Sequence, residues 1–407
     1  MIPIGFLATW LLAAAALCAL VPSLVLLLEV AFALRRQPLT APVLARPLRM
    51  AVVVPAHDEE VQIGASVRAL RGELGPSDRL LVVADNCQDR TATLAREAGA
   101  EVIERQDSSQ QGKGFAISFG VAHLAAAPPD VVVLVDADCA VVRGRLSELA
   151  ADALAAGTVV QADYLIRAPA GAAGMAAVNA FAILLRNRVR PLGLDRLARV
   201  CQLTGSGMAF PWPVLKAAPA MRENLVEDMA LGVELTLRGQ PPRLCPEVRV
   251  QSELPSQARA LLGQRRRWEH GQLDTMAAYV PRLLSAFLHR SERALLGLAL
   301  DLLVPPLALL AMLQLALLVV TGAAAGLGLA SSLPLFLAAL SVVMVLVATS
   351  LAWWFFGREV LSVGAALRIP FYVLWKTGLY VSLLVRGKQK TWERTEREPS
   401  DVDSQGK

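Results

Sequence analysis

Two aspartates separated by one residue are the first residues whose type and spacing suggest chemistry. Asp136 and Asp138 end the apolar run VVVLVDAD at 131–138. In an extended chain, side chains at i and i+2 point to the same side. Two carboxylates held together repel each other unless a cation or a proton lies between them. Two solvated loop acids would give the same pattern, but the preceding apolar run favours a divalent metal bound through oxygen and shared with substrate phosphates.

A second acidic pair, Glu227 and Asp228, lies in LVEDMALG at 225–232. Adjacent acids at a helix start can simply favour the helix dipole. They can also supply a general base, which must reach the proton that it removes. The glycine-rich segment LTGSGMAFPWP at 203–213, with Gly205 and Ser206, precedes this pair. This segment either permits close approach of a substrate or forms a plain turn.

The stretch GQRRRWEHG at 263–271 concentrates positive charge beside a tryptophan. At helical pitch, three consecutive arginines fan over roughly 200° and cannot all face one ligand. Gln264 and Trp268, at i and i+4, can share a face. The stretch is therefore either a basic patch against a membrane or part of a site that holds an anion.

The elements that must position these residues alternate between strand and helix. Apolar, β-branched runs predict strands at 50–56, 79–85, 100–105 and 131–138. Helical stretches lie between these strands, at 59–70, 89–99 and 112–127. This alternation predicts an α/β fold, Rossmann-like, with a mostly parallel sheet covered on both faces. Ligands in such folds bind at the carboxyl ends of strands. Polar residues follow three of these runs: His57–Asp58–Glu59–Glu60, Asp85–Asn86, and the Asp136/Asp138 pair. No G-x-G-x-x-G follows the first strand and no P-loop occurs.

The chain is 55% hydrophobic and 18% charged, and its apolar residues are concentrated towards its two ends. The segment 3–34 contains one charged residue, Glu29, and exceeds the ~20 residues that span a bilayer. The arginines that follow it place the next domain in the cytoplasm. Two further spans are predicted at about 294–322 and 331–356. Asp301 in the first is either a functional intramembrane acid or a hydrated residue near the cytoplasmic end.

Two other segments suit a membrane surface. The stretch 361–386 carries Arg368, Pro370 and Lys376, which favour an interfacial or re-entrant helix and a cytosolic tail. The stretch 173–197, with Arg186, Arg188 and Arg190, is either an amphipathic helix at the membrane surface that guides an acceptor or an ordinary core helix. The predicted organisation is an N-terminal transmembrane helix, a cytosolic domain, a C-terminal membrane region and a basic tail, over residues 1–35, 48–285, 292–386 and 387–407.

The remaining composition excludes some classes of protein. Five scattered cysteines without a C-x-x-C pair indicate reduced thiols on a cytosolic face. The net charge of +5 is explained by basic residues that flank apolar segments. Because no nucleic-acid motif is present, we expect no nucleic-acid partner. A transporter would need more spans and more intramembrane polar residues.

Five short motifs together resemble a known family. Five motifs occur in the order and rough spacing of membrane-integrated family 2 glycosyltransferases, the group that includes cellulose, chitin and hyaluronan synthases and related glycolipid enzymes. They are VVVPAHDEE (52–60), VVADNCQD (82–89), VDAD (135–138), VEDMALG (226–232) and QRRRW (264–268). Each motif alone is weak, and the five in order are specific. The resemblance implies a GT-A-type cytosolic domain over about residues 50–270.

The resemblance also implies roles for individual residues. Pro55, Ala56 and Glu60 would line the nucleoside pocket, Asp85 would contact the base, and Lys113 would reach the base or the diphosphate. Asp138, with Asp136 beside it, would coordinate Mg²⁺ or Mn²⁺ on the diphosphate. Asp228, next to Glu227, would deprotonate the acceptor hydroxyl. Gln264, Trp268, Gly205 and Ser206 would contact the acceptor, and Arg267 the diphosphate. Trp392, Arg394 and Thr395 belong to a tail that either closes over the nucleotide or binds anionic lipid.

The function implied is inverting, metal-dependent transfer from a nucleotide-diphosphate sugar, a UDP-sugar by preference, at the bacterial inner membrane. QRRRW favours a polymerising enzyme with a saccharide acceptor. The small number of spans favours a single transfer to a lipid acceptor, unless an oligomer or an accessory export partner completes the path across the membrane. A catalytically inactive membrane scaffold is the third alternative, and the complete set of acids argues against it.

Overall fold

The computed structural model describes most of the chain, namely residues 4–35, 48–167, 175–219, 227–253, 258–366 and 369, with the backbone alone at 4, 175, 227 and 258–267. The chain divides into two compact units. The sheet unit contains residues 37–169, 199–271 and 390–407, and the helical unit contains residues 1–36, 170–198 and 272–389.

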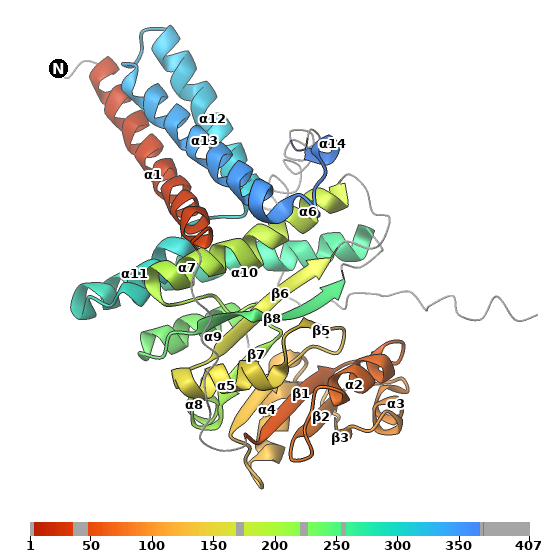
Figure 1. Cartoon of the computed structure of the whole chain (residues 1–407). Helices are drawn as coiled ribbons and strands as arrows, with labels where there is room; N and C mark the ends of the chain where they lie inside the picture. The colour runs from red at the N-terminus through yellow and green to blue at the C-terminus, as the bar shows by residue number, and fades with distance from the viewer. Residues whose placement is uncertain are drawn as a thin grey trace, which may run out of the picture. The chain divides into compact units, whose positions relative to one another are not determined.

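The sheet unit is built on an eight-stranded sheet of order β3-β2-β1-β4-β7-β6-β8-β5 (Figure 1). Its strands are β1 Met50–Ala56, β2 Arg79–Asp85, β3 Glu101–Arg105, β4 Val131–Leu134, β5 Ala140–Arg143, β6 Val160–Arg167, β7 Met208–Pro211 and β8 Arg243–Glu253. Strands β3, β2, β1 and β4 are parallel to one another. β7 is antiparallel to both β4 and β6, whereas β6 and β8 are parallel. The predicted α/β, Rossmann-like and mostly parallel sheet is confirmed.

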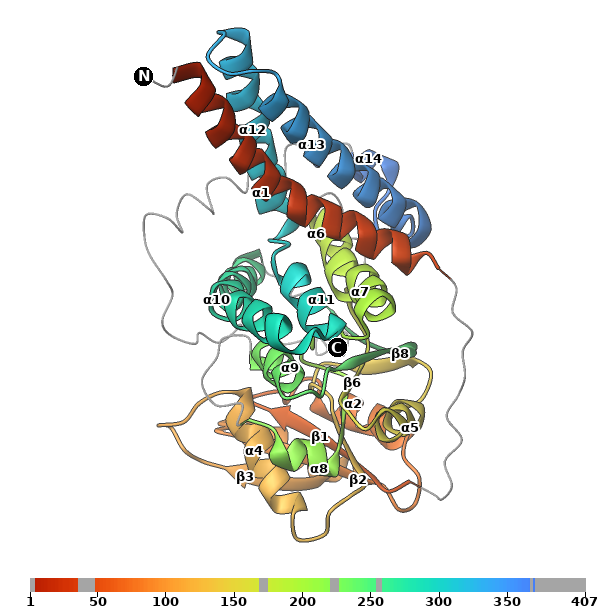
Figure 2. The same cartoon turned by 90° about the vertical axis from the view of Figure 1, so that its left-hand side faces the viewer.

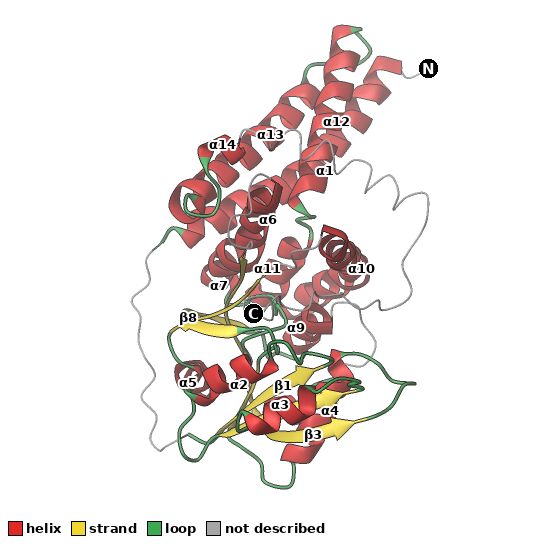
Figure 3. Ribbon diagram, turned by 90° about the vertical axis from the view of Figure 1, so that its right-hand side faces the viewer, coloured by secondary structure: helices red, strands yellow, loops and turns green. Residues whose placement is uncertain are grey.

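Helices cover both faces of the parallel half (Figure 3). The helices of this unit are α2 Ile63–Arg71, α3 Thr91–Glu97, α4 Lys113–Leu124, α5 Leu146–Ala156, α8 Trp212–Ala217 and α9 Glu227–Leu237. Val53 and Leu81 belong to a buried cluster with Ile117 of α4. Their neighbours Val52 and Val82, which point to the opposite face, are fully buried as well. The continuous apolar strands therefore reflect burial on two sides.

Three long apolar helices of the helical unit are long enough to cross a membrane: Gly5–Ala33, Leu307–Gly326 and Leu333–Gly357. They correspond to α1 Ile4–Ala33, α12 Leu307–Gly326, and α13 Leu333–Ala352 with its continuation η2 Trp353–Gly357, and they lie side by side (Figure 2). Gln314 of α12 donates from Nε2 to Ser23 Oγ of α1 (2.6 Å) and to Ser341 O of α13 (3.3 Å). One buried amide thus connects all three helices, as polar groups do between membrane helices.

The stretch predicted as a single span over 294–322 is divided in the structure. It contains α11 Arg293–Leu302 and α12, which are separated around Pro305–Pro306 because proline cannot continue the preceding hydrogen-bond ladder. The stretch at 173–197 contains α6 Met175–Leu184, the π-helix η1 Leu185–Val189 and α7 Arg190–Ala198. The 33-residue helix α10 Ala258–Arg290 belongs to both units, and α14 Val363–Ala366 is the last helix described.

A buried charge cluster joins three helices of the helical unit. Arg190 of α7 donates from Nε to Glu29 Oε2 of α1 (2.9 Å) and from Nη2 to Asp301 Oδ1 of α11 (2.7 Å). Each of the three residues is less than 10% exposed. Asp301 lies in α11, outside the three apolar spans, and is 2% exposed. The greater part of the 361–386 helix and the whole tail lie outside the described residues.

Candidate active site

The carboxyl edge of the parallel strands carries a group of polar side chains that contact one another. Strand β4 ends at Leu134, so Asp136 and Asp138 follow directly at that edge. Lys113 begins helix α4, and its Nζ forms an ion pair with Asp136 Oδ1. The same ammonium group donates to the carbonyl oxygen of Gly205 at 2.7 Å. A residue from the α4 start thus connects the D-x-D segment to the glycine-rich loop.

Asp228 lies beside the same loop. It is the second residue of α9, and its Oδ2 is 3.1 Å from the position that a Cβ at Gly205 would occupy. Gly205 has φ +95°, a conformation that favours glycine, and the missing side chain leaves room for the Asp228 carboxylate. The structure therefore brings together four of the predicted site residues: Lys113, Asp136, Gly205 and Asp228.

The electrostatics of Asp136 follow from this crowding. Burial raises the pKa of Asp136, the Lys113 ammonium opposes that rise, and the carboxylates of Asp138 and Asp228 add to it. The side chain is still 28% exposed at the edge of the sheet. Several negative charges around one ammonium group make a site that favours an additional cation.

The donor atoms near Asp136 suit a hard divalent metal. Ligand atoms of Asp136, Asp138 and Cys139 lie within 4.8 Å of one another. Burial raises the pKa of the Cys139 thiol well above its usual value, and Ser206 Oγ lies 3.2 Å from its sulfur. The two carboxylates supply oxygen ligands. Oxygen ligands are those that Mg²⁺ and Mn²⁺ prefer, so these residues fit the predicted metal.

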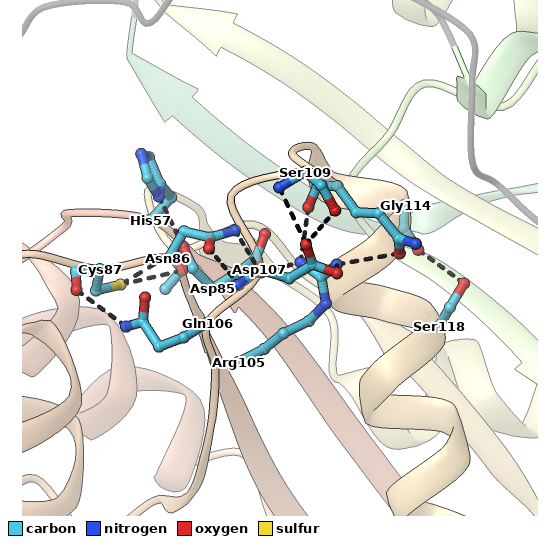
Figure 4. A network of polar contacts seen from close by, with 12 residues as sticks. His57, Asp85, Asn86, Cys87, Arg105, Gln106, Asp107, Ser109, Gly114 and Ser118 are labelled. Atoms are coloured by element: carbon cyan, nitrogen blue, oxygen red, sulfur yellow. Dashed lines mark hydrogen bonds and ion pairs between the residues drawn. The ribbon is translucent and has the colours of Figure 1, made fainter.

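Asp85 ends β2 in a polar network at the same edge (Figure 4). Arg105, the last residue of β3, donates from Nη1 to Asp85 Oδ1 at 2.6 Å and to Gln110 O at 2.8 Å. Asn86 Oδ1 accepts from the backbone N–H of Asp107 at 2.7 Å, which holds the loop after β3 against the end of β2. The sequence predicted that Asp85 contacts the nucleotide base, but it did not predict the pairing of Asp85 with Arg105. The two residues lie 20 positions apart, and no motif spacing connects them.

The segment after β1 forms the neighbouring part of this edge. Ala56 is buried, Pro55 is half-buried and Glu60 is exposed. Glu60 Oε2 accepts from the backbone N–H of Arg90 at 3.2 Å, and His57 Nδ1 lies 2.7 Å from Asp85 O. The three predicted pocket residues thus lie at the end of β1, next to the strand that carries Asp85.

The structure describes only some of the remaining predicted site residues. Ser206 is fully buried, and its Oγ accepts from the Asp136 backbone N–H at 3.0 Å. Ser206 belongs to the glycine-rich loop, and its buried hydroxyl supports Asp136. Trp268 is half-buried in α10. The side chains of Glu227, Gln264 and Arg267, and all of Trp392, Arg394 and Thr395, lie outside what the structure describes.

Residues 47–271 match the family described as "Glycosyltransferase like family 2", over more than half of the chain. The chain belongs to glycosyltransferase family 2. The matched range covers the whole sheet and every site residue described above. The match identifies the family and does not identify the synthase-like subgroup with the QRRRW motif.

Individual relatives match shorter segments of this chain. A probable glycosyltransferase, YdaM of Bacillus subtilis, is 34% identical over 98 residues, which are 22% of this chain and 23% of that protein. The 4,4'-diaponeurosporenoate glycosyltransferase of Staphylococcus aureus is 32% identical over 97 residues, 23% of this chain and 25% of that protein. The chain therefore matches about a quarter of the length of these relatives.

One solved structure resembles nearly the whole chain. The mannosyltransferase PcManGT from Pyrobaculum calidifontis, in complex with GDP-Man and Mn²⁺, has a TM-score of 0.53 and 17% sequence identity. The similarity covers 93% of this chain and 100% of that one. At this identity the likeness shows the fold, which is GT-A with associated helices.

Proposed function

We propose that this family 2 member is an inverting, metal-dependent glycosyltransferase that uses a nucleotide-diphosphate sugar. The observation that carries the proposal is the meeting of Lys113, Asp136 and Asp228 around Gly205 at the carboxyl edge of the sheet. An ammonium group, a pair of metal-binding carboxylates and a separate carboxylate are the groups that displacement of a diphosphate by a hydroxyl requires.

The roles of these residues follow from the reaction. Asp228 accepts the proton of the acceptor hydroxyl as its oxygen attacks the anomeric carbon. The new glycosidic bond forms on the face opposite to the diphosphate, whose bond to the anomeric carbon breaks, so the configuration inverts. Lys113 neutralises part of the charge that develops on the leaving diphosphate. Mg²⁺ or Mn²⁺ held by Asp136 and Asp138 would supply further positive charge next to the leaving diphosphate.

Donor binding would involve the ends of β1 and β2. Pro55, Ala56 and Glu60 would border the nucleoside, and Asp85, held by Arg105, would accept a hydrogen bond from the base. We propose UDP as the nucleotide, as the resemblance to the synthase group suggests. Arg267 would contact the diphosphate, with Gln264 and Trp268 at the acceptor sugar.

We propose the bacterial inner membrane as the location, with the sheet unit in the cytoplasm. The backbone N–H of Ser331 donates to Thr9 Oγ1 at 2.9 Å, which brings the start of α1 to the α12–α13 turn. The opposite ends of α1 and α13 carry Arg35 and Arg358, each stacked on an aromatic ring of its own helix end. Basic residues at one end of a bundle favour the cytoplasmic side.

Two acceptor classes are supported by different observations. The QRRRW motif supports extension of a saccharide, as in exopolysaccharide synthesis. The Staphylococcus aureus relative, named for a diaponeurosporenoate substrate, supports a single transfer to a lipid acceptor. The three long apolar helices agree with that second class, because a polymer needs a wider path across the membrane.

A donor screen on the detergent-purified chain, followed by sizing of the product, tests both parts. UDP- and GDP-sugars are offered with Mn²⁺, with short oligosaccharides and bacterial lipid extract as acceptors. A ladder of products identifies a polymerising enzyme, and one discrete lipid-linked product identifies a single transfer. If no donor loses its sugar in the presence of metal, the proposed function is wrong.

A further inference from the structure

The loop at 204–207 contacts three residues of the proposed catalytic centre, Lys113, Asp136 and Asp228. Gly205 O accepts from Lys113 Nζ, and Gly205 lies against the Asp228 carboxylate. Ser206 Oγ accepts from the Asp136 backbone N–H and donates to Cys139 Sγ, next to Asp138. A shift of this loop would therefore move Lys113, the metal-binding segment and the proposed general base, Asp228, relative to one another.

Among the described residues, backbone hydrogen bonds fix the loop at its Gly207 end. Gly207 N donates to Leu134 O at 2.9 Å, and Gly207 O accepts from Ala162 N at 2.7 Å. These two bonds anchor the loop where β7 begins. The residues that touch the catalytic groups, Gly205 and Ser206, come before this anchor.

Gln161 of β6 supplies the second attachment. The residue is 1% exposed, and its side-chain amide bonds to the loop at three points. Nε2 donates to Ser206 O at 2.8 Å and to Gly207 O at 3.4 Å, and Oε1 accepts from the backbone N–H of Thr204 at 2.9 Å. Nε2 also donates to Ala162 O at 2.9 Å, so the amide itself is held in one orientation.

We propose that Gln161 is a positioning residue for the transferase reaction, and that it holds the 204–207 loop where Lys113, Asp136 and Asp228 can act together. The proposal rests on the function proposed above for this site. An amide is required because it offers a donor and an acceptor at once. Without it, Thr204 N–H and Ser206 C=O lose their buried partner, and the loop must move to satisfy them.

The expected effect is on kcat rather than on donor binding. A displacement of about 1 Å in a catalytic group costs up to about a hundredfold in rate. An interaction needed for the reacting geometry lowers kcat with little change in KM. We therefore expect Gln161→Met, which keeps the volume and loses all four bonds, to lower kcat at least about tenfold and to change the donor KM less than about threefold.

Thr158→Val provides a matched control for lost stability. Thr158 precedes β6, is buried, and donates from Oγ1 to Gln240 O (3.1 Å) and Pro241 O (3.2 Å), both outside the site. This variant also removes buried side chain–backbone bonds near β6, so its Tm should fall by a similar amount. Its kcat, measured below the Tm of both variants and per folded molecule, should stay within about twofold of wild type.

The experiment measures kcat, donor KM and Tm for wild type, Gln161→Met, Gln161→Glu and Thr158→Val with the donor found in the screen. Gln161→Glu keeps the acceptor for Thr204 N–H and replaces Gln161→Met if that variant is not recovered folded. A kcat loss confined to the Gln161 variants supports the proposal. Wild-type kcat in a folded Gln161 variant, or an equal loss in Thr158→Val, overturns it. If wild type itself is inactive, the proposed function fails and this proposal fails with it.

Discussion

Arg105 Nη1 lies 2.6 Å from Asp85 Oδ1, and both side chains are less than 10% exposed. This buried pair joins the ends of β2 and β3. The same guanidinium holds the loop that leads to Lys113 through Gln110 O, and it lies 5.4 Å from the Phe115 ring of α4. Arg105 therefore supports both a proposed base-binding residue and the start of the helix that carries Lys113.

Replacing Arg105 should damage the fold and donor binding together. Arg105→Met leaves the Asp85 carboxylate buried without its counter-charge, which costs about 3–5 kcal/mol when one partner of a buried pair is removed. The donor KM should also rise, because Asp85 is no longer held in place. Thermal unfolding in detergent and a donor titration measure the two effects.

Arg79→Met is the matched control for this change. Arg79 pairs with Glu101 between the same two strands, with side chains 30% and 38% exposed. An exposed pair contributes only about 0–1 kcal/mol. Equal losses of Tm in the two variants would show that burial does not set the strength of the Arg105–Asp85 pair.

Gly205→Ala should inactivate the enzyme more than it destabilises the fold. A Cβ at Gly205 would lie 3.1 Å from Asp228 Oδ2, so it would push directly on that carboxylate, and it would contact Lys113 Nζ at 3.7 Å. We expect kcat to fall by about a hundredfold, since small displacements in a reacting centre have effects of that size. The measurement is the rate of nucleoside diphosphate release at saturating donor.

Gly157→Ala separates this effect from backbone strain. Gly157 ends α5 with φ +65°, and a Cβ there would meet nothing within 4 Å. Both substitutions place alanine at a positive φ, which costs of the order of 1 kcal/mol. If Gly157→Ala reduced kcat as much as Gly205→Ala, contact with Asp228 would not be the cause.

In the helical unit, the charges around Arg190 predict an order of stability. Arg190→Met leaves two buried carboxylates with no cation and should cost about 3–5 kcal/mol. Glu29→Gln leaves one guanidinium with one carboxylate, a balanced pair, and should cost clearly less. Glu29 Oε1 has no hydrogen-bond partner among the described residues, which agrees with an excess of acceptors at this site. Thermal unfolding in detergent gives the order.

The exposed Arg290–Glu292 pair offers the comparison for that series. Its two side chains are 32% and 42% exposed. Arg290→Met should therefore change the Tm little. A Glu29→Gln variant as unstable as Arg190→Met would contradict the charge-balance explanation.

The sequence predicted the parallel half of the sheet well because burial on both faces leaves continuous β-branched runs. β1 and β2 begin and end at the predicted residues, Met50–Ala56 and Arg79–Asp85. The antiparallel half, from β5 to β8, was not assigned to strands. Val160–Arg167 mixes polar and apolar residues because Asp163 pairs with Arg249 and Gln161 binds the loop, so its pattern is weak.

The site was predicted as a set of residue types, and its internal contacts were not. D-x-D after an apolar run suggested a metal, and Lys113 was expected to reach the nucleotide base or the diphosphate. That Lys113 also meets Gly205, and that Asp85 is held by Arg105, depends on loops whose paths carry no periodicity. The split of 294–322 had a visible signal in Pro305–Pro306, whereas the pairing of Arg190 with Glu29 and Asp301 depends on helix packing across 161 and 111 residues.

The most direct test of the central proposal is metal-dependent release of nucleoside diphosphate from a nucleotide sugar by wild type, Asp138→Ala and Asp228→Asn in membranes. We expect wild type to turn over with Mn²⁺ or Mg²⁺ and to stop when EDTA removes the metal. Both variants should lose about a hundredfold or more in kcat. Wild-type rates in either variant, or turnover that continues unchanged in EDTA, would contradict the proposed site.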